Sequence, residues 1–268
     1  MTRTAEIRCG IGGWTYAPWR SNFYPKGLVQ RRELEHASRQ LDTIEINGTW
    51  YGAQKPATYA KWASETPDGF VFSLKAPRYT TAARKLAASA AAIADFIGDL
   101  DAFGDRLGPV LWQFERGRAF DRDDFAAFLT HLPATVGTRT LRHVLEVRDP
   151  SFRCAEFIAL ARAERRPIVF TDSPEHPSFA DVTGDFVYLR LMRARTDVAS
   201  GYPPAELRSW ARRARLWRDG GEPDDLPRVL DVPAAKKARN VFVYFINGAK
   251  ERAPHAAMAL RAQLQSTS

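Results

Sequence analysis

A carboxylate and an amide lie two residues apart in the segment Thr43-Ile44-Glu45-Ile46-Asn47. The β-branched residues around them predict a buried strand, along which alternate side chains point to the same side. Glu45 and Asn47 therefore face one interior, as Glu146 and Arg148 do at the end of a second apolar segment. Such pairs are typical of a functional site, and a buried pair that only satisfies its own hydrogen bonds is the alternative.

Other apolar segments also end in polar side chains, which can bind a substrate or move a proton. These residues are Lys75, Gln113, Asp172, Arg190 and Asn247. We predict that the carboxylates Glu45, Glu146 and Asp172 are the catalytic acids and bases, because neighbouring carboxylates in a partly buried site can differ widely in pKa.

The basic residues at the predicted strand ends can have either of two roles. Lys75, Arg148 and Arg190 can bind an anionic substrate group, or they can neutralise the carboxylates in a structural ring of ion pairs. The sequence leaves both open.

The elements that position these residues alternate along the chain. Apolar segments predict strands at 7–12, 43–47, 70–75, 107–114, 141–148, 167–172, 185–190 and 240–247. Helical patterns fall at 28–40, 56–65, 82–100, 121–131, 155–165, 203–218 and 254–264, with Asp121 as an N-cap. This alternation predicts an α/β protein with a single TIM-like (β/α)8 barrel domain over residues 1–268, regular or irregular. The C-terminal ends of barrel strands carry the active site in such enzymes, and the polar residues gather there.

A loop rich in aromatic residues follows the first strand. Glycines at positions 10, 12 and 13 suggest a dinucleotide-binding turn, but no helix begins after them. Trp14, Tyr16 and Trp19, together with Tyr51, can instead form a stacking wall for a substrate, or they can plug the mouth of the barrel.

Composition narrows the class of protein. The 268 residues are 45% hydrophobic and 26% charged, as in ordinary globular proteins. No apolar run approaches the roughly 20 residues of a membrane span, and the start lacks the apolar core of a signal peptide, which predicts a cytoplasmic protein.

Cys9 and Cys154 form no metal-binding motif, and the five histidines are scattered, so we expect neither a metal nor a cofactor. His143 should face away from the barrel interior, because its spacing from Glu146 places it on the other side of the strand.

Several motifs resemble one known family. They are GxGGWxYxxWxxxFYP at residues 10–25, EINxTWY at 45–51, FxFxxK at 70–75, LGPVLxQF at 107–114, ExR at 146–148 and VYFxN at 243–247. In this order they closely resemble the domain of unknown function 72 family, often called YecE-like, over nearly the whole chain. The resemblance implies a TIM-barrel-like fold and does not imply a reaction.

Two departures from the family pattern fall after predicted strands. Met192 and Arg193 stand where many relatives have His-Gly, and Glu115 and Arg116 stand where many have Pro-Pro. Both changes indicate a subgroup with altered substrate contacts, or none, at the C-terminal ends of the barrel strands.

The leading hypothesis is a metal-independent hydrolase, lyase or isomerase that acts on a small anionic or sugar-like substrate. The net charge of +8 and the arginine-rich segment 208–218 suggest a nucleic-acid-binding protein as an alternative. The arginines of that segment also fit a solvated amphipathic helix. A catalytically inactive barrel used as a scaffold is the third interpretation. The sequence does not indicate an oligomeric state.

Overall fold

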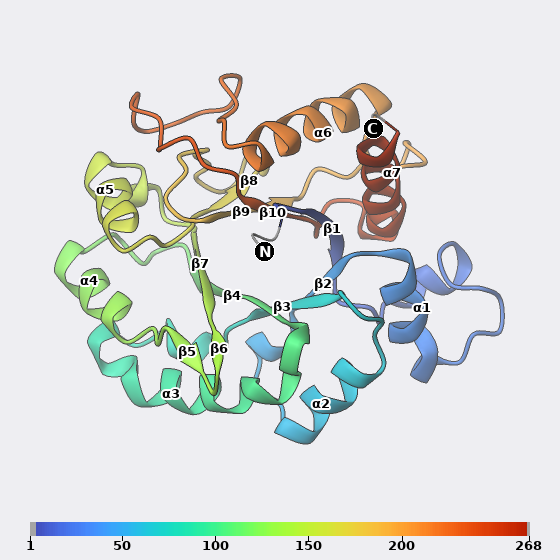
Figure 1. Cartoon of the computed structure of the whole chain (residues 1–268), viewed down its shortest axis with the longest axis horizontal. Helices are drawn as coiled ribbons and strands as arrows, with labels where there is room; N and C mark the ends of the chain where they lie inside the picture. Colours follow the sequence, from blue (N-terminus) through green and yellow to red (C-terminus); the bar gives the residue numbers. More distant parts are fainter. Residues whose placement is uncertain (1–3, 267–268) are drawn as a thin grey trace.

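Eight parallel strands form a nearly closed barrel surrounded by helices (Figure 1). The computed structural model describes residues 4–266. The strands are β1 (Ile7–Gly12), β2 (Thr43–Ile46), β3 (Val71–Lys75), β4 (Leu107–Phe114), β7 (Arg142–Val147), β8 (Val169–Thr171), β9 (Phe186–Leu191) and β10 (Asn240–Phe245). The predicted TIM-like barrel is confirmed, with each predicted strand in its expected place.

The barrel closes between β7 and β8, which are the two ends of the strand order β7-β4-β3-β2-β1-β10-β9-β8. The Leu145 amide donates a 2.9 Å hydrogen bond to the Pro167 carbonyl, and Leu145 also forms an isolated parallel bridge with Ile168. The other neighbouring strands share ladders of at least three residue pairs. The β7–β8 seam is therefore the part of the barrel wall with the fewest backbone contacts.

The helices lie around the outside of the barrel (Figure 1). They are α1 (Glu33–Gln40), α2 (Pro56–Ser64), α3 (Ala90–Gly98), α4 (Arg122–Thr130), α5 (Ala155–Ala163), α6 (Pro204–Arg218) and α7 (Ala253–Gln265). Asp121 caps α4 as predicted, accepting a 3.1 Å hydrogen bond from the Asp124 amide. The chain between β8 and β9 forms no helix, and a small hairpin of β5 (Thr135–Val136) and β6 (Arg139–Thr140) precedes β7. The barrel is thus an irregular one.

The prediction of one helix over residues 82–100 is wrong in extent. The α-helix α3 is preceded by the 3-10 turn Leu86–Ser89 and followed by the 3-10 segment Asp99–Arg106. The Asp124 carboxylate of α4 accepts a 2.9 Å hydrogen bond from the Leu86 amide and so fixes the start of this segment. A contact with a neighbouring helix therefore overrides the high helix propensity of the alanines.

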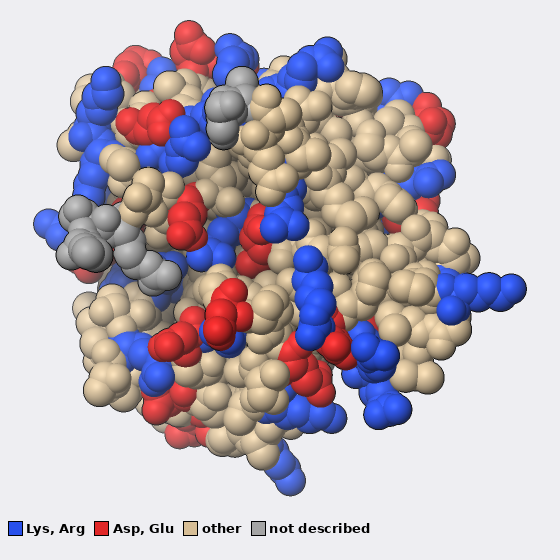
Figure 2. Space-filling view, turned by 45° about the vertical axis from the view of Figure 1, so that its right-hand side comes forward, with Lys and Arg blue, Asp and Glu red and all other residues tan. Residues whose placement is uncertain are grey.

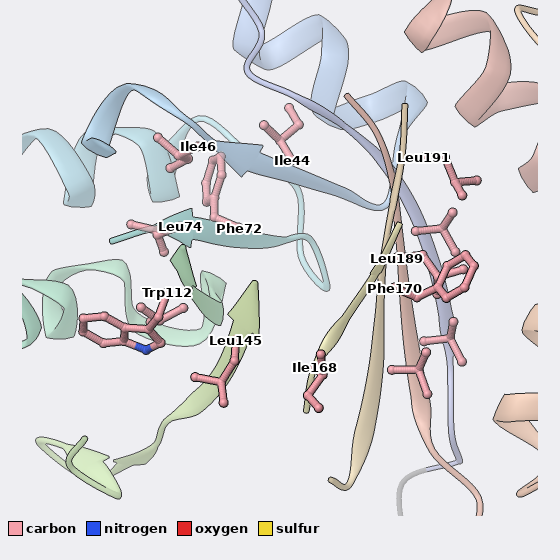
Figure 3. Packing of buried hydrophobic residues seen from close by; sticks show 14 of the residues in the cluster. Ile44, Ile46, Phe72, Leu74, Trp112, Leu145, Ile168, Phe170, Leu189 and Leu191 are labelled. Atoms are coloured by element: carbon pink, nitrogen blue, oxygen red, sulfur yellow. The ribbon is translucent and has the colours of Figure 1, made fainter. Parts of the chain in front are cut away.

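Apolar side chains form two layers on either side of the barrel wall. The outer layer packs the strands against the helices, and Figure 3 shows Phe170, Leu189 and Leu191 pointing away from the barrel axis within it. The inner layer fills the barrel and includes Leu111, Val144, Val169, Phe186 and Phe242. The interior becomes polar only toward the C-terminal ends of the strands.

Glycines allow close approach at the end of β1. A Cβ atom at Gly10 would lie 2.1 Å from the Thr43 carbonyl oxygen, so only glycine fits there without moving the backbone of β2. A Cβ atom at Gly12 would lie 2.9 Å from the amide nitrogen of Asn47. The missing side chain at Gly12 therefore makes room for Asn47.

Among residues 4–266, no helix has the length and apolar character that crossing a membrane requires.

Candidate active site

Arg190 lies between two carboxylates at the C-terminal end of the barrel interior, and all three side chains are buried. Its Nε and Nη2 atoms donate to the two Glu45 oxygens at 3.1 and 3.0 Å. Its Nη1 atom lies 2.7 Å from both Glu146 oxygens. The three residues come from β9, β2 and β7, so the ion pairs join strands that are not neighbours. We call them the ion triad.

Tyr188 connects the triad to the apolar interior below it. The Tyr188 hydroxyl donates a 2.7 Å hydrogen bond to Glu45 Oε2 and lies 2.7 Å from the Ser73 hydroxyl. Burial, with the charge of Glu45, raises the pKa of Tyr188 well above its ordinary value. Tyr188 therefore stays protonated and serves as a fixed donor to Glu45.

Glu146 is held as an anion. Burial alone would raise its pKa, but the charges of Arg190, Arg148 and Lys75 outweigh burial and lower the pKa to about 2. A general acid must carry a proton near the working pH, which Glu146 does not do at neutral pH. Its predicted role as an acid is therefore not favoured by this geometry.

This pKa predicts a pH dependence of stability. The folded-state pKa of about 2 lies below the ordinary value of 4.5, so the stabilisation from ionised Glu146 is complete above pH 4.5. It should be lost as the pH falls from 4.5 toward 2. Urea unfolding at pH 7, 4 and 3 measures this loss.

The variant Glu146→Gln should be less stable at pH 7 and should lose less stability on acidification. The control Glu156→Gln, at an exposed position, should behave as the parent does. An equal acid loss in the parent and in Glu146→Gln would contradict the assignment.

Lys75 lies at the end of β3 with a buried amine. Its side chain is only 8% exposed, and its Nζ atom lies 4.0 Å from the centre of the Trp50 ring. Lys75 forms no ion pair with any residue in the described part of the chain. Burial, followed by the charge of Arg190, lowers the pKa of Lys75 to about 8, although Glu146 and Glu45 oppose the shift. A fraction of this amine is therefore unprotonated at neutral pH.

Arg148 and Gln113 lead outward from the triad. Arg148 Nη2 lies 3.1 Å from Glu146 Oε1, and its Nη1 atom lies 3.6 Å from Glu115 Oε2. The Gln113 amide nitrogen also donates to Glu115, while its carbonyl oxygen is buried and has no partner among residues 4–266. Gln113 thus keeps one acceptor for a further group.

A basic cleft lies beyond Glu115, between the loops that follow β3 and β4. It has a volume of about 470 Å³, and its lining includes Arg78, Arg84 and Arg116. None of these three arginines forms an ion pair within the described residues. None of the three is predicted as a binding residue from the sequence, although Arg116 belongs to one of the two departures from the family pattern. We call this space the rim cleft.

The remaining predicted site residues lie elsewhere. Asp172 accepts hydrogen bonds from the Met192 amide at 2.6 Å and the Tyr202 hydroxyl at 2.8 Å, and burial raises its pKa. Asn247 is exposed and lies 3.9 Å from the Met192 sulfur. Tyr51 is 90% exposed and has no described ring contact. No described contact joins any of these residues to the triad.

Asn47 lies beside Gly12, where its amide nitrogen is 3.4 Å from the Glu45 carbonyl oxygen. It thus remains near the triad but contacts backbone. Met192, at the other departure from the family pattern, packs in the inner apolar layer, and Arg193 is exposed.

The aromatic loop packs mainly against the protein itself. Trp14 contacts Trp62 with ring centres 5.0 Å apart, and Trp19 is fully buried. Tyr16 packs against Trp19 at 5.3 Å, and the Lys250 amine lies 4.6 Å from the Tyr16 ring. These contacts favour a plugging and packing role over a stacking wall.

Three arginines of α6 have acidic partners. Arg212 and Arg213 lie 2.8 and 3.0 Å from Asp225, and Arg218 lies 2.8 Å from Asp219. On the face shown in Figure 2, basic and acidic side chains are intermingled. This pairing favours the interpretation of α6 as a solvated face.

Histidines and cysteines do not gather into a metal site. Within residues 4–266, no group of three His, Cys, Asp or Glu side chains could hold a metal ion. His143 faces outward as predicted, and its Nδ1 atom accepts a 3.0 Å hydrogen bond from the Trp112 indole.

Comparisons with known proteins place the chain in a family. The family model described as "Protein of unknown function DUF72" matches residues 8–268. A DUF72 protein of Thermotoga maritima is 18% identical, with a TM-score of 0.73 over 97% of this chain and 99% of that chain. A DUF72 protein of Enterococcus faecalis is 15% identical, with a TM-score of 0.68 over 96% and 95%. A xylose isomerase-like TIM barrel/4-hydroxyphenylpyruvate dioxygenase fusion protein is 16% identical, with a TM-score of 0.50 over 98% of this chain and 44% of that chain. No curated protein matches the sequence.

Proposed function

This chain belongs to the DUF72 family of proteins of unknown function, and from that premise we propose that it is a metal-independent enzyme in which Lys75 transfers a proton. The substrate is a small anionic or sugar-like molecule bound at the C-terminal end of the barrel. The single observation that carries the proposal is the amine of Lys75, which is buried against Trp50 and lacks an ion pair among residues 4–266.

The surroundings suit Lys75 to proton transfer. Acid–base catalysis is most efficient when the pKa of the catalytic group lies near the working pH, and the pKa of Lys75 is lowered to about 8. The carboxylates of the triad are ion-paired with Arg190, whereas Lys75 forms no ion pair among residues 4–266. Lys75 thereby takes the role for which Glu45 and Glu146 were predicted.

The rim cleft supplies the binding site for the anionic group. Arg78 follows Lys75 by three residues, so the chain separates their Cα atoms by at most about 11 Å. A phosphate or carboxylate held by Arg78 and Arg116 would lie beside the loop that follows Lys75, and the rest of a small substrate would extend from there toward the amine.

The proposed step is an isomerisation. The neutral amine removes a proton from a carbon next to the substrate carbonyl and becomes an ammonium group. The electron pair of the broken C–H bond moves onto the carbonyl oxygen as an enolate. The carbon that lost the proton also carries a hydroxyl group. The ammonium returns the proton to the former carbonyl carbon while the hydroxyl proton passes to the enolate oxygen, so the carbonyl and the alcohol exchange places and no external oxidant or reductant is needed.

A titration of Lys75 tests this proposal. After reductive methylation with ¹³C-formaldehyde, the Lys75 methyl signal should titrate with a midpoint near pH 8. The spectrum of Lys75→Arg assigns this signal by its disappearance. Addition of small sugar phosphates and hydroxy acids should shift the Lys75 signal, and the shift should be lost in Arg78→Gln/Arg116→Gln. A midpoint above pH 10 would overturn the proposal.

A further inference from the structure

A second basic site lies at the opposite end of the barrel. A groove of about 1110 Å³ is lined by the segment 140–143 at the start of β7, the segment 164–167 before β8, the segment 182–186 before β9 and the segment 233–239 before β10. Because the strands are parallel, all these segments lie at their N-terminal ends, away from Lys75. We call this space the basal groove.

The basal groove carries an excess of positive charge. Its basic lining residues are Arg142, Arg162, Arg165, Arg166, Lys237 and Arg239, whereas its acidic residues are Glu164 and Asp185. Arg162, Arg166 and Arg239 form no ion pair within the part of the chain that the structure describes. In this they differ from Arg212, Arg213 and Arg218 of α6, whose charges are paired with aspartates.

Buried guanidinium atoms in the groove also lack hydrogen-bond acceptors. Arg239 is only 4% exposed, and two of its nitrogens donate to the carbonyls of Gly220 and Ala235. Its Nε atom has no partner among the described residues, and the same is true of Arg162 Nη2 and Arg166 Nε. Burial lowers the pKa of Arg166 and of Arg239. Buried donors without acceptors are costly, and three of the arginines that line the groove carry one each.

The backbone at Arg165 provides independent support. Arg165 adopts a left-handed φ of 51° directly after α5, at the position where helices usually end with glycine. The Arg166 amide donates to the Ala161 carbonyl at 2.8 Å and the Arg165 amide donates to the Arg162 carbonyl at 3.1 Å, as this helix ending requires. Arginine is strained at this position, whereas glycine is not. The side chain that lines the groove is thus present at a conformational cost.

We propose that the basal groove binds a small ligand that carries a chain of adjacent phosphate groups. One guanidinium can hold one phosphate by two hydrogen bonds. Arg162, Arg166 and Arg239, which form no ion pair among residues 4–266, therefore match several phosphates better than one. The volume exceeds what a single phosphate would fill, and the position makes this site separate from the one proposed around Lys75.

Calorimetric titration with inorganic tripolyphosphate at low ionic strength tests the proposal. The parent protein should bind tripolyphosphate at least about tenfold more tightly than orthophosphate. A nucleoside triphosphate in a second arm distinguishes the source of the phosphates. Tighter binding than tripolyphosphate would show that the base also contributes, and equal binding would assign the site to the phosphate chain alone. Both results support the groove as a polyphosphate site.

Variants locate the binding. Arg165→Gly combined with Arg166→Gln should fold normally, because glycine suits the backbone at 165, and should lower the affinity for tripolyphosphate about tenfold or more. Arg208→Gln, which removes an exposed charge of α6 outside the groove, should change the affinity less than about twofold. The inference is overturned if the parent does not bind tripolyphosphate, if the two variants weaken binding equally, or if a single-stranded oligonucleotide binds more tightly than either triphosphate.

Discussion

Replacing Arg190 with methionine should destabilise the protein by about 3–5 kcal/mol. The substitution leaves Glu45 and Glu146 buried, charged and close together, with their common cation removed. Breaking a buried ion pair is costly for this reason, even though the intact pair adds little net stability. Urea unfolding at pH 7 followed by circular dichroism measures the loss.

A matched variant separates loss of pairing from loss of packing. The combination of Arg190→Met with Glu45→Gln and Glu146→Gln removes the stranded charges and should be more stable than Arg190→Met alone by about 1–3 kcal/mol. Arg212→Met, on the exposed face of α6, should cost less than about 1 kcal/mol. If Arg190→Met costs no more than Arg212→Met, the triad does not hold the barrel together.

Replacing Lys75 with methionine should lower kcat by about 10²- to 10⁴-fold for a substrate found by the titration of Lys75, because a positioned general base contributes about that much. Methionine keeps most of the side-chain volume that Lys75 places against Trp50, and it removes a positive charge that Arg190 repels. The fold should therefore persist. KM should change little, since the rim cleft binds the anionic group. Enzyme assays with circular dichroism as the folding control measure both effects.

The pH profile gives a further readout of the same role. In the parent, kcat/KM should rise through a pKa near 8 as the amine loses its proton. Lys75→Arg keeps the positive charge but cannot give it up near neutral pH, so it should not restore turnover. Lys61→Met, at an exposed site on α2, serves as the control and should leave kcat unchanged. Activity in Lys75→Arg comparable with the parent would exclude Lys75 as the base.

The sequence predicts the strands well because each strand is an apolar run, and most of these runs are separated by helical segments. Alternation also places His143 outside the barrel and Glu146 inside it, as the structure confirms. The same rule could have placed Asp172 outside, because it shares the parity of Phe170, which packs in the outer layer. Its position at a strand end suggested the rim, but alternation decides where its carboxylate points.

The pairing within the site could not be predicted in the same way. Arg190 meets Glu45 and Glu146 only because closure of the barrel brings β9, β2 and β7 around one axis. The pattern of residues within each strand does not reveal the distance between side chains of different strands. The basal groove depends on four separated segments, and its unpaired arginines resemble solvated surface residues in the sequence. The rim cleft could not be predicted for the same reason, since Arg78 and Arg116 come from different loops.

The ion triad connects strands on both sides of the β7–β8 seam, where backbone contacts are few. Arg190 on β9 reaches past β8 to Glu146 on β7, so its guanidinium acts as a brace across the seam with the fewest backbone contacts. Opening of the barrel wall at this seam would have to separate Arg190 from Glu146. The ion pair between Arg190 and Glu146 thus joins the two sides of the seam where ladder hydrogen bonds are fewest.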